Sequence, residues 1–250
     1  MGYQQGLSGL SASSSDLDVI GNNIANANTV GFKSGAAQFA DMYANSVATA
    51  VGNQVGIGTK LSEVQQQFSQ GTITSTNQAL DVAINGNGYL VVQTAGGDRY
   101  TRNGSLQING QGQLVTGDGA PVIGDNGPIV FQPTDHDVMI SPDGRVTVTE
   151  AGATNTESLR GQIRIVSFAA PQQLQKEGNN LYVAPAGVAA TPDTSSKLIQ
   201  GSIEKSNVNG VVAISRLIEI SRAYAQVAQL LSNQSDLHKN AISQLANVPT

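Results

Sequence analysis

Residues 209–250 carry an apolar pattern that repeats every seven positions. This spacing corresponds to the a and d positions of a heptad repeat, which place their side chains along one narrow stripe of a helix. A helix that lies on a globular core shows a wider apolar face, so the narrow stripe predicts a partner helix. The two lines of the pattern are Leu217, Tyr224, Leu231, His238 and Leu245, and Ala213, Ile220, Val227, Gln234 and Ala241.

Residues 1–30 contain apolar side chains at steps of three, four or seven positions, which predicts a second helix. Gly6, Gly9 and Gly21 each lower the helix propensity by roughly 1 kcal/mol relative to alanine, so this helix requires packing to persist. We predict that it pairs with the C-terminal helix as a coiled coil; the alternative is two separate amphipathic helices flanking a β core. The apolar positions are Leu7, Leu10, Leu17, Ile20, Ile24 and Ala27.

The middle of the chain changes to a period of two, with short apolar runs separated by Gly, Asn and Asp. This pattern is typical of an antiparallel sandwich or barrel-like domain. Residues 85–88 (Asn-Gly-Asn-Gly) predict a hairpin between the strands at 80–84 and 89–93. The predicted fold class is therefore α+β, mainly β. Its expected parts are a helical domain from 1–30 and 208–250, a connecting arm at 31–75 and an inserted β domain at 76–207.

Composition argues against several classes of function. Only 12% of residues are charged, the net charge is −5, and the chain has no basic run, so nucleic acid is not an expected partner. The chain has no cysteine, which excludes disulfides and thiolate chemistry. No phosphate-binding loop or nucleophile elbow occurs. His136 and His238 are the only histidines, and we interpret Asp135-His136-Asp137 as a solvated turn. We expect no catalytic residue, cofactor, metal or small-molecule substrate.

The N-terminal residues have neither the basic region nor the apolar region of a cleaved signal peptide. No apolar run reaches the length of a membrane-spanning helix. The expectation is a protein that either stays in the cytoplasm or leaves it by a route that uses no cleaved signal.

Four blocks carry a more specific pattern: residues 17–34 (LDVIGNNIANANTVGFKS), 78–89 (QALDVAINGNGY), 100–107 (YTRNGSLQ), and 204–209 (EKSNVN) running into 217–224. In content and order they resemble the signatures of the bacterial flagellar rod and hook family. The resemblance spans both ends and the middle of the chain. The family-motif residues that it singles out are Asn22, Asn23, Asn26, Gly31, Phe32, Asp81, Asn103, Gly104, Ser206, Asn207 and Val208.

This resemblance implies a structural subunit of the flagellar axial tube. It implies terminal helices that pair around a central channel, a β domain further out, and helical self-assembly. The implied partners are further copies, other rod and hook proteins, and the flagellar type III export apparatus. Within the family, the run at 121–129 favours a proximal rod subunit, with a distal rod subunit and a short hook protein as alternatives. Outside the family, the alternatives are an enzyme of the cell envelope and a β-sandwich adhesin on a helical stalk.

Overall fold

The computed structural model describes residues 2–43, 56–150 and 157–246, with one long helix near each end and many short strands between them. The chain forms two compact units. The first unit comprises Met1–Ala25, Gly35–Gln67 and Asn209–Thr250, and the second comprises Asn26–Ser34 and Phe68–Val208. The fold is thus mainly β with an N-terminal and a C-terminal helix, which confirms the predicted class.

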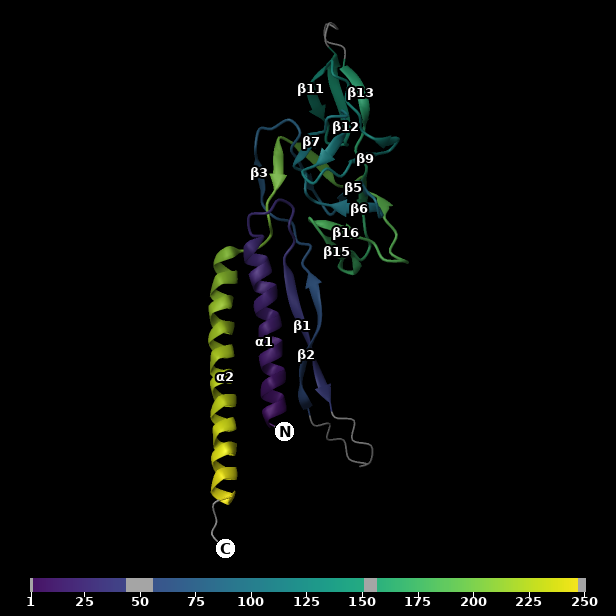
Figure 1. Ribbon diagram of the computed structural model, residues 1–250. Helices are drawn as coiled ribbons and strands as arrows, with labels where there is room; N and C mark the ends of the chain where they lie inside the picture. The colour runs from purple at the N-terminus through teal and green to yellow at the C-terminus, as the bar shows by residue number, and fades with distance from the viewer. Residues whose placement is uncertain (1, 44–55, 151–156, 247–250) are drawn as a thin grey trace. The chain divides into compact units, whose positions relative to one another are not determined.

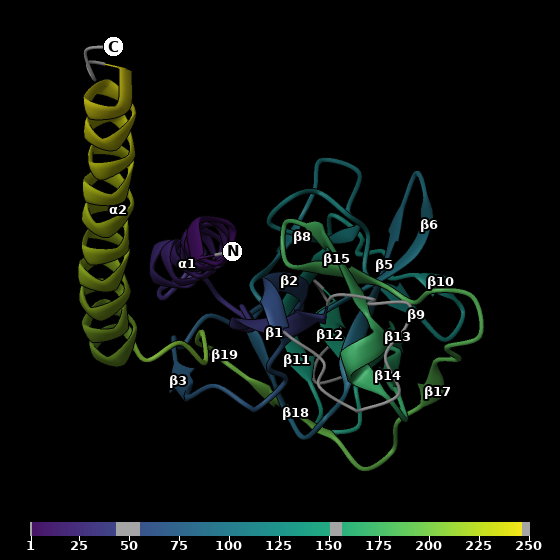
Figure 2. The ribbon, with the colours of Figure 1, turned by 90° about the horizontal axis from the view of Figure 1, so that it is seen from below.

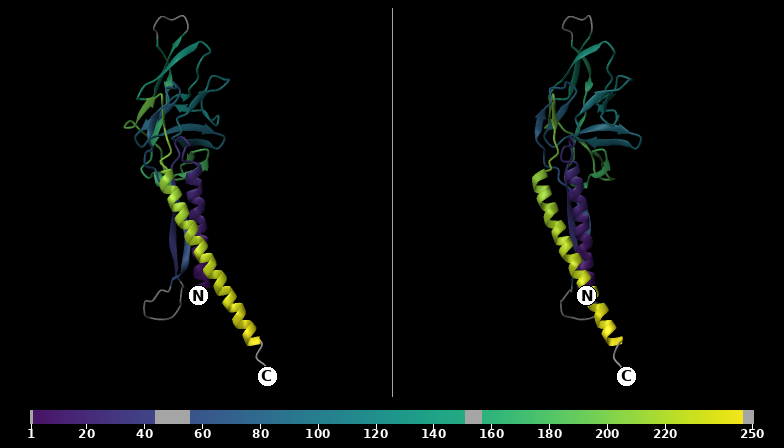
Figure 3. Two further views of the ribbon diagram at one scale, coloured as in Figure 1. Left: turned by 90° about the vertical axis from the view of Figure 1, so that its left-hand side faces the viewer. Right: turned by 60° about the vertical axis from the view of Figure 1, so that its left-hand side comes forward.

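The first unit contains the two helices and one β-hairpin. Helix α1 (Gly2–Ala25) lies between helix α2 (Gly210–Ala246) and the hairpin of β1 (Gly35–Tyr43) and β2 (Gly56–Gln66), as Figure 1 shows. The helices run antiparallel to each other, and Figure 3 shows that their axes diverge toward the C-terminal end of α2. The distal part of α2 therefore extends beyond the packing surface of α1.

The range predicted as a connecting arm contains this hairpin. Strands β1 and β2 pair in an antiparallel ladder that runs from Gly35 opposite Gln66 to Tyr43 opposite Gly56. The sequence did not predict this pairing within the arm. Residues 44–55, in the middle of the range expected to be a connecting arm, lie outside the described residues.

Residues suited to turns and caps follow α1 and precede α2. After α1 ends at Ala25, the chain turns through a bond from Thr29 N to Asn26 O of 3.1 Å and reaches Gly31 at φ +69°. This left-handed conformation suits glycine because it has no Cβ. At the start of α2, the side chain of Asn209 accepts a hydrogen bond from Val212 N at 3.2 Å, which is an N-cap.

The second unit is built from short antiparallel strands and one 3₁₀ turn, η1 (Pro171–Gln173). One sheet has six strands in the order β15-β16-β6-β5-β14-β17, another has three in the order β11-β12-β13, and the rest are pairs. Figure 2 shows these sheets arranged around a shared interior. The strands are β3 (Ile73–Ser75), β4 (Val82–Asn85), β5 (Tyr89–Thr94), β6 (Gly97–Thr101), β7 (Leu106–Ile108), β8 (Leu114–Thr116), β9 (Ile123–Gly124), β10 (Gly127–Pro128), β11 (Asp135–Ile140), β12 (Arg145–Glu150), β13 (Glu157–Gln162), β14 (Ile165–Ser167), β15 (Gln175–Gly178), β16 (Leu181–Val183), β17 (Thr191–Pro192), β18 (Lys197–Gln200) and β19 (Ser202–Glu204).

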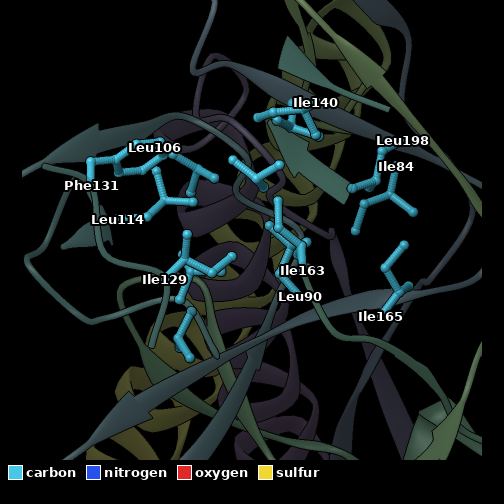
Figure 4. Packing of buried hydrophobic residues seen from close by; sticks show 14 of the residues in the cluster. Ile84, Leu90, Leu106, Leu114, Ile129, Phe131, Ile140, Ile163, Ile165 and Leu198 are labelled. Atoms are coloured by element: carbon cyan, nitrogen blue, oxygen red, sulfur yellow. The ribbon is translucent and has the colours of Figure 1, made fainter. Parts of the chain in front are cut away.

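Strand β5 is buried on both faces and separates two apolar clusters. Leu90 and Val92 point into the larger cluster, which Figure 4 shows converging from several strands, with Ile84 and Ile163 among its members. Tyr89 and Val91 point into the smaller cluster. There the aromatic rings of Phe68, Tyr89, Tyr100, Phe168 and Tyr182 meet edge to face, with centroids 4.8–6.2 Å apart. The continuous apolar run of β5 is typical of such a doubly buried strand.

The hairpin predicted at residues 85–88 is wrong. Strand β4 pairs with β18, and β5 pairs with β6, so the two neighbouring strands do not pair with each other. The glycines serve a close approach instead. Gly88 N donates to Ser196 Oγ at 3.0 Å, and a Cβ on Gly86 would lie 2.4 Å from the same oxygen. The glycines at 86 and 88 are thus explained by the close approach of the loop that contains Ser196, and not by a hairpin turn.

Gly104 sits where no side chain fits, and this generates the first prediction. A Cβ at this position would lie 1.6 Å from Val82 O, and Gly104 O accepts the bond from Val82 N at 2.8 Å. We expect Gly104→Ala to lower the unfolding free energy of the second unit by about 3 kcal/mol or more, because the backbone must move. Urea unfolding followed by near-ultraviolet circular dichroism measures it.

Gly110→Ala is the matched control, because nothing lies within 4 Å of the added Cβ. Equal effects of the two substitutions would contradict the steric account.

Candidate functional site

The stripe predicted on the C-terminal helix is the side of α2 that is partly covered. Most residues of α2 outside this stripe are exposed. Seven members of the stripe are partly buried: Ala213, Leu217, Ile220, Tyr224, Val227, Leu231 and Gln234. The covering element is α1, where Ile20 is 4% exposed and Leu10, Leu17 and Ile24 are partly buried. Leu7 is 52% exposed and His238 is exposed, while the side chain of Leu245 lies outside the described residues. The part that these residues play in assembly stays a prediction.

Two polar contacts fix α1 within its unit. The carboxylate of Asp16, which is 8% exposed, receives a bond from Arg216 Nη2 at 3.1 Å and so joins α1 to α2. The side chain of Asn23 brackets the backbone of Gly35, donating to its oxygen at 2.8 Å and accepting from its nitrogen at 2.9 Å. This motif asparagine thereby fastens the end of α1 to the start of β1, whereas its neighbour Asn22 faces outward.

Seven further large apolar side chains of α2, which we call the exposed apolar residues, are not covered by the described chain. These side chains are 47–77% exposed: Val211, Val212, Ile214, Ile218, Leu230, Leu237 and Ile242. A shallow groove of about 610 Å³ opens nearby, lined by Leu7, Leu10 and Tyr224 together with polar residues of α1. An exposed apolar surface of this extent marks an interaction site.

The second unit contains a buried ion cluster, which we define as Lys33, Arg102 and Glu204. Their side chains are 0–2% exposed. The Glu204 carboxylate accepts from Lys33 Nζ at 2.6 Å and from Arg102 Nη1 at 2.9 Å. These contacts join positions that are 171 and 102 residues apart in sequence. Buried charges require such pairing, because an isolated charge in the interior is strongly unfavourable.

The ion cluster also holds three backbone segments. Glu204 accepts from Gly71 N at 2.7 Å through its carboxylate and from Gly31 N at 2.8 Å through its carbonyl oxygen. Lys33 Nζ donates to Ser69 O at 2.7 Å. A Cβ on Gly31 would lie 2.5 Å from the carbonyl carbon of Arg102, so the motif glycine permits this close approach.

The electrostatics follow from two cations sharing one carboxylate. Burial lowers the pKa of Lys33, the neighbouring Arg102 charge lowers it further, and Glu204 opposes both effects. Arg102 also donates to Gly86 O and lies over the ring of Tyr89, 5.3 Å from its centroid. Burial raises the pKa of Tyr89 to about 12. The neutral phenol is therefore favoured beside the cluster.

Asn207 ties together the segments next to the cluster. Its Oδ1 accepts from Ser34 N at 2.8 Å, its Nδ2 donates to both oxygens of Ser69 at 3.1 Å, and its backbone nitrogen donates to Phe32 O at 3.3 Å. Ser206 Oγ accepts from Val208 N at 3.2 Å. The chain segments just after α1 and just before α2 are thus joined inside the second unit.

The remaining motif residues shape turns and packing in the same unit. Phe32 is 2% exposed and lies under Lys176 Nζ, 3.8 Å from the ring centroid. Asn103 Oδ1 accepts from Ser105 N at 3.1 Å, and Asn26 Oδ1 accepts from Thr29 Oγ1 at 3.2 Å. Asp81 is 5% exposed.

The sequence interpretation did not select the ion cluster, although all three residues lie inside the quoted blocks. Charged residues are scarce in this chain, at 12%, so a charged residue within an otherwise uncharged block was a signal that could have identified the cluster.

His136 lies in β11 with Nδ1 at 3.3 Å from Thr134 O, and Asp135 pairs with Arg160 at 2.6 Å. Among the described residues, no group of three or more acidic, histidine or cysteine side chains could hold a metal ion. None of the described helices has the length and hydropathy needed to cross a membrane.

Comparisons with known proteins agree with these features. Family profiles described as "Flagella basal body rod protein", "Flagellar hook protein FlgE/F/G D1 domain" and "Flagellar basal body rod FlgEFG protein C-terminal" match residues 4–33, 83–148 and 199–245. The basal-body rod protein FlgF of Caulobacter vibrioides is 37% identical over 93% of both chains. The rod protein FlgG is 34% identical in Bacillus subtilis and 37% in Caulobacter vibrioides, over 95% of this chain and 96% of each relative.

These similarities define the class as a structural protein of the flagellar basal body. The chain belongs to the family of flagellar basal-body rod proteins.

The ion cluster generates the second prediction. Glu204→Gln keeps the shape of the side chain but leaves Lys33 and Arg102 buried without a counter-charge. We expect the unfolding free energy of the second unit to fall by about 3–5 kcal/mol. Chemical denaturation measures it, with Asp143→Asn as the control, because the Asp143–Arg145 pair is 47% and 63% exposed and contributes about 1 kcal/mol or less. A loss as small as that of the control would show that the cluster is not stabilising.

The third prediction concerns alkaline pH. Because the pKa of Tyr89 rises from 10.0 in the unfolded chain to about 12 in the fold, its contribution to stability is complete below about pH 10. That contribution is lost as the pH rises from about 10 to about 12. An absorbance titration of tyrosinate should show late ionisation, and Tyr89→Phe should remove the part that comes from Tyr89. The rest remains late because burial also raises the pKa of Tyr182. Ionisation of all six tyrosines near pH 10 in the folded protein would contradict it.

Proposed function

We propose that this rod-family subunit self-assembles helically through its terminal helices into the axial drive shaft of the flagellum. The observation that carries the proposal is the apolar surface of α2. One stripe is partly covered by α1, whereas seven other large apolar side chains of the same helix are exposed. Full burial of an exposed leucine or isoleucine contributes about 1.5–3 kcal/mol, so several together favour association.

The helical unit offers two different surfaces, which fits head-to-tail assembly. They are the exposed apolar residues of α2 and the shallow groove lined by Leu7, Leu10 and Tyr224. A surface that binds a different surface on the next copy gives an open helical array when the rotation does not close. A tubular rod requires contacts of this kind.

Within the family we propose a proximal rod subunit of the FlgF type, supported by the similarity to the Caulobacter vibrioides FlgF protein. A distal rod subunit of the FlgG type is the second candidate, because FlgG of the same organism is equally identical. A short hook protein is third. The proposed partners are further copies, other rod and hook proteins and the flagellar type III export apparatus. The proposed location is the periplasm-spanning rod, reached without a cleaved signal peptide.

Adjacent leucines on α2 provide the fourth prediction. Leu231 faces α1, where a Cβ on Gly6 would lie 2.8 Å from its Cδ2, whereas Leu230 is 66% exposed. We expect Leu230→Asp to leave the secondary structure of the monomer unchanged but to abolish incorporation into rods and swimming. We expect Leu231→Asp to lower the helix content of the monomer as well, because a charge enters the α1–α2 packing surface.

Circular dichroism of the monomer and swimming assays of the complemented strain separate the two effects. Gln229→Asp is the control, since this exposed residue is already polar. Normal incorporation of Leu230→Asp into rods would contradict assembly through the exposed apolar residues of α2.

A further inference from the structure

The three-stranded sheet of the second unit has one buried and one exposed face. On the central strand β12, Val146 and Val148 are 0–1% exposed and point inward, so Thr147 and Thr149 point outward. Cross-strand pairing places Met139 and Leu159 on either side of Thr147. Met139 is 53% and Leu159 is 61% exposed. They form an apolar row across the outer face.

Strand β13 is at the edge of this sheet. The strand order is β11-β12-β13, and no other strand of the described chain pairs with β13 along its second edge. Figure 1 shows β13 on the outside of the group. An edge strand presents unpaired backbone N–H and C=O groups that can bind an extended peptide. Leu159 lies in the middle of this edge.

The charges around the edge are mainly acidic. Residues 135–162 contain five acidic and two basic side chains. Arg160 binds Asp135 at 2.6 Å and Glu150 at 2.9 Å, and Arg145 binds Asp143 at 3.1 Å, which uses both cations. Glu157 is exposed on β13 and forms no ion pair with the described residues. A carboxylate without a counter-ion therefore lies two residues from Leu159 on the same face.

We propose that the free edge of β13 binds an extended peptide segment of another protein by strand addition. The segment carries a basic residue opposite Glu157 and an apolar, β-branched residue opposite Leu159. These two positions are two residues apart because side chains on one face of a strand alternate. The same edge of a second copy is a poorer occupant, because it carries the same local excess of acidic over basic side chains. The surface lies in the second unit, and the proposal does not depend on assembly through the helices.

The probe is a fluorescein-labelled peptide with the sequence Thr-Lys-Thr-Val-Thr-Lys-Thr, which presents the basic and apolar positions in either strand direction. Anisotropy with the full chain should show saturable binding. Leu159→Glu should weaken binding at least about tenfold, a change of about 1.4 kcal/mol. Ile108→Glu is the control, because Ile108 is a comparably exposed apolar residue of β7, 40% exposed.

A charge exchange makes the test specific. Glu157→Lys should weaken binding of the lysine peptide and create binding of the peptide Thr-Glu-Thr-Val-Thr-Glu-Thr. Thermal unfolding checks that each variant is folded, and Leu159→Thr replaces Leu159→Glu if the latter is not. Amide chemical-shift changes should concentrate on β13.

Three results would overturn the proposal. They are the absence of saturable binding at about 1 mM peptide, equal binding by the Leu159→Glu variant and the wild-type protein, and chemical-shift changes confined to residues outside β13. Self-association of the protein that depends on Leu159 would assign the edge to a second copy and would also overturn it.

Discussion

The second unit depends on the ion pairs that the buried carboxylate of Glu204 forms with Lys33 and Arg102. The same carboxylate also accepts a hydrogen bond from Gly71 N, and the backbone carbonyl of Glu204 accepts one from Gly31 N. Each of these contacts crosses more than one hundred residues of sequence. Because a buried carboxylate is stable only when its partners are in place, this cluster forms only when all of these segments are folded together.

This arrangement explains why the family signature extends beyond the helices. Residues 26–34 follow α1 and residues 202–208 precede α2, yet both belong to the β-rich unit. The bonds of Asn207 to Ser34 and Ser69 join them there. The segments that follow α1 and precede α2 are therefore joined to each other inside the β-rich unit.

Local patterns could be read from the sequence, and long-range contacts could not. The heptad lines predicted which side of α2 is covered, and the period-two pattern predicted short antiparallel strands in the middle of the chain, because these features depend on neighbouring residues. The β4–β18 pairing and the ion cluster depend on residues about one hundred or more positions apart, which no periodicity encodes. The turn signal at 85–88 was misleading because its glycines accommodate Ser196. The β1–β2 hairpin was missed because the first part of β2 is rich in glycine and lacks apolar alternation.

Native-state hydrogen exchange of the wild-type protein tests the central claim most directly. The amides of Gly31, Gly71 and Asn207 bond to the cluster or its neighbouring segments, whereas those of Val82 and Leu114 lie in the core. The account predicts that all five amides exchange with the same free energy, that of unfolding the whole second unit. Rapid exchange of the first three by local opening, while Val82 and Leu114 stay protected, would contradict it.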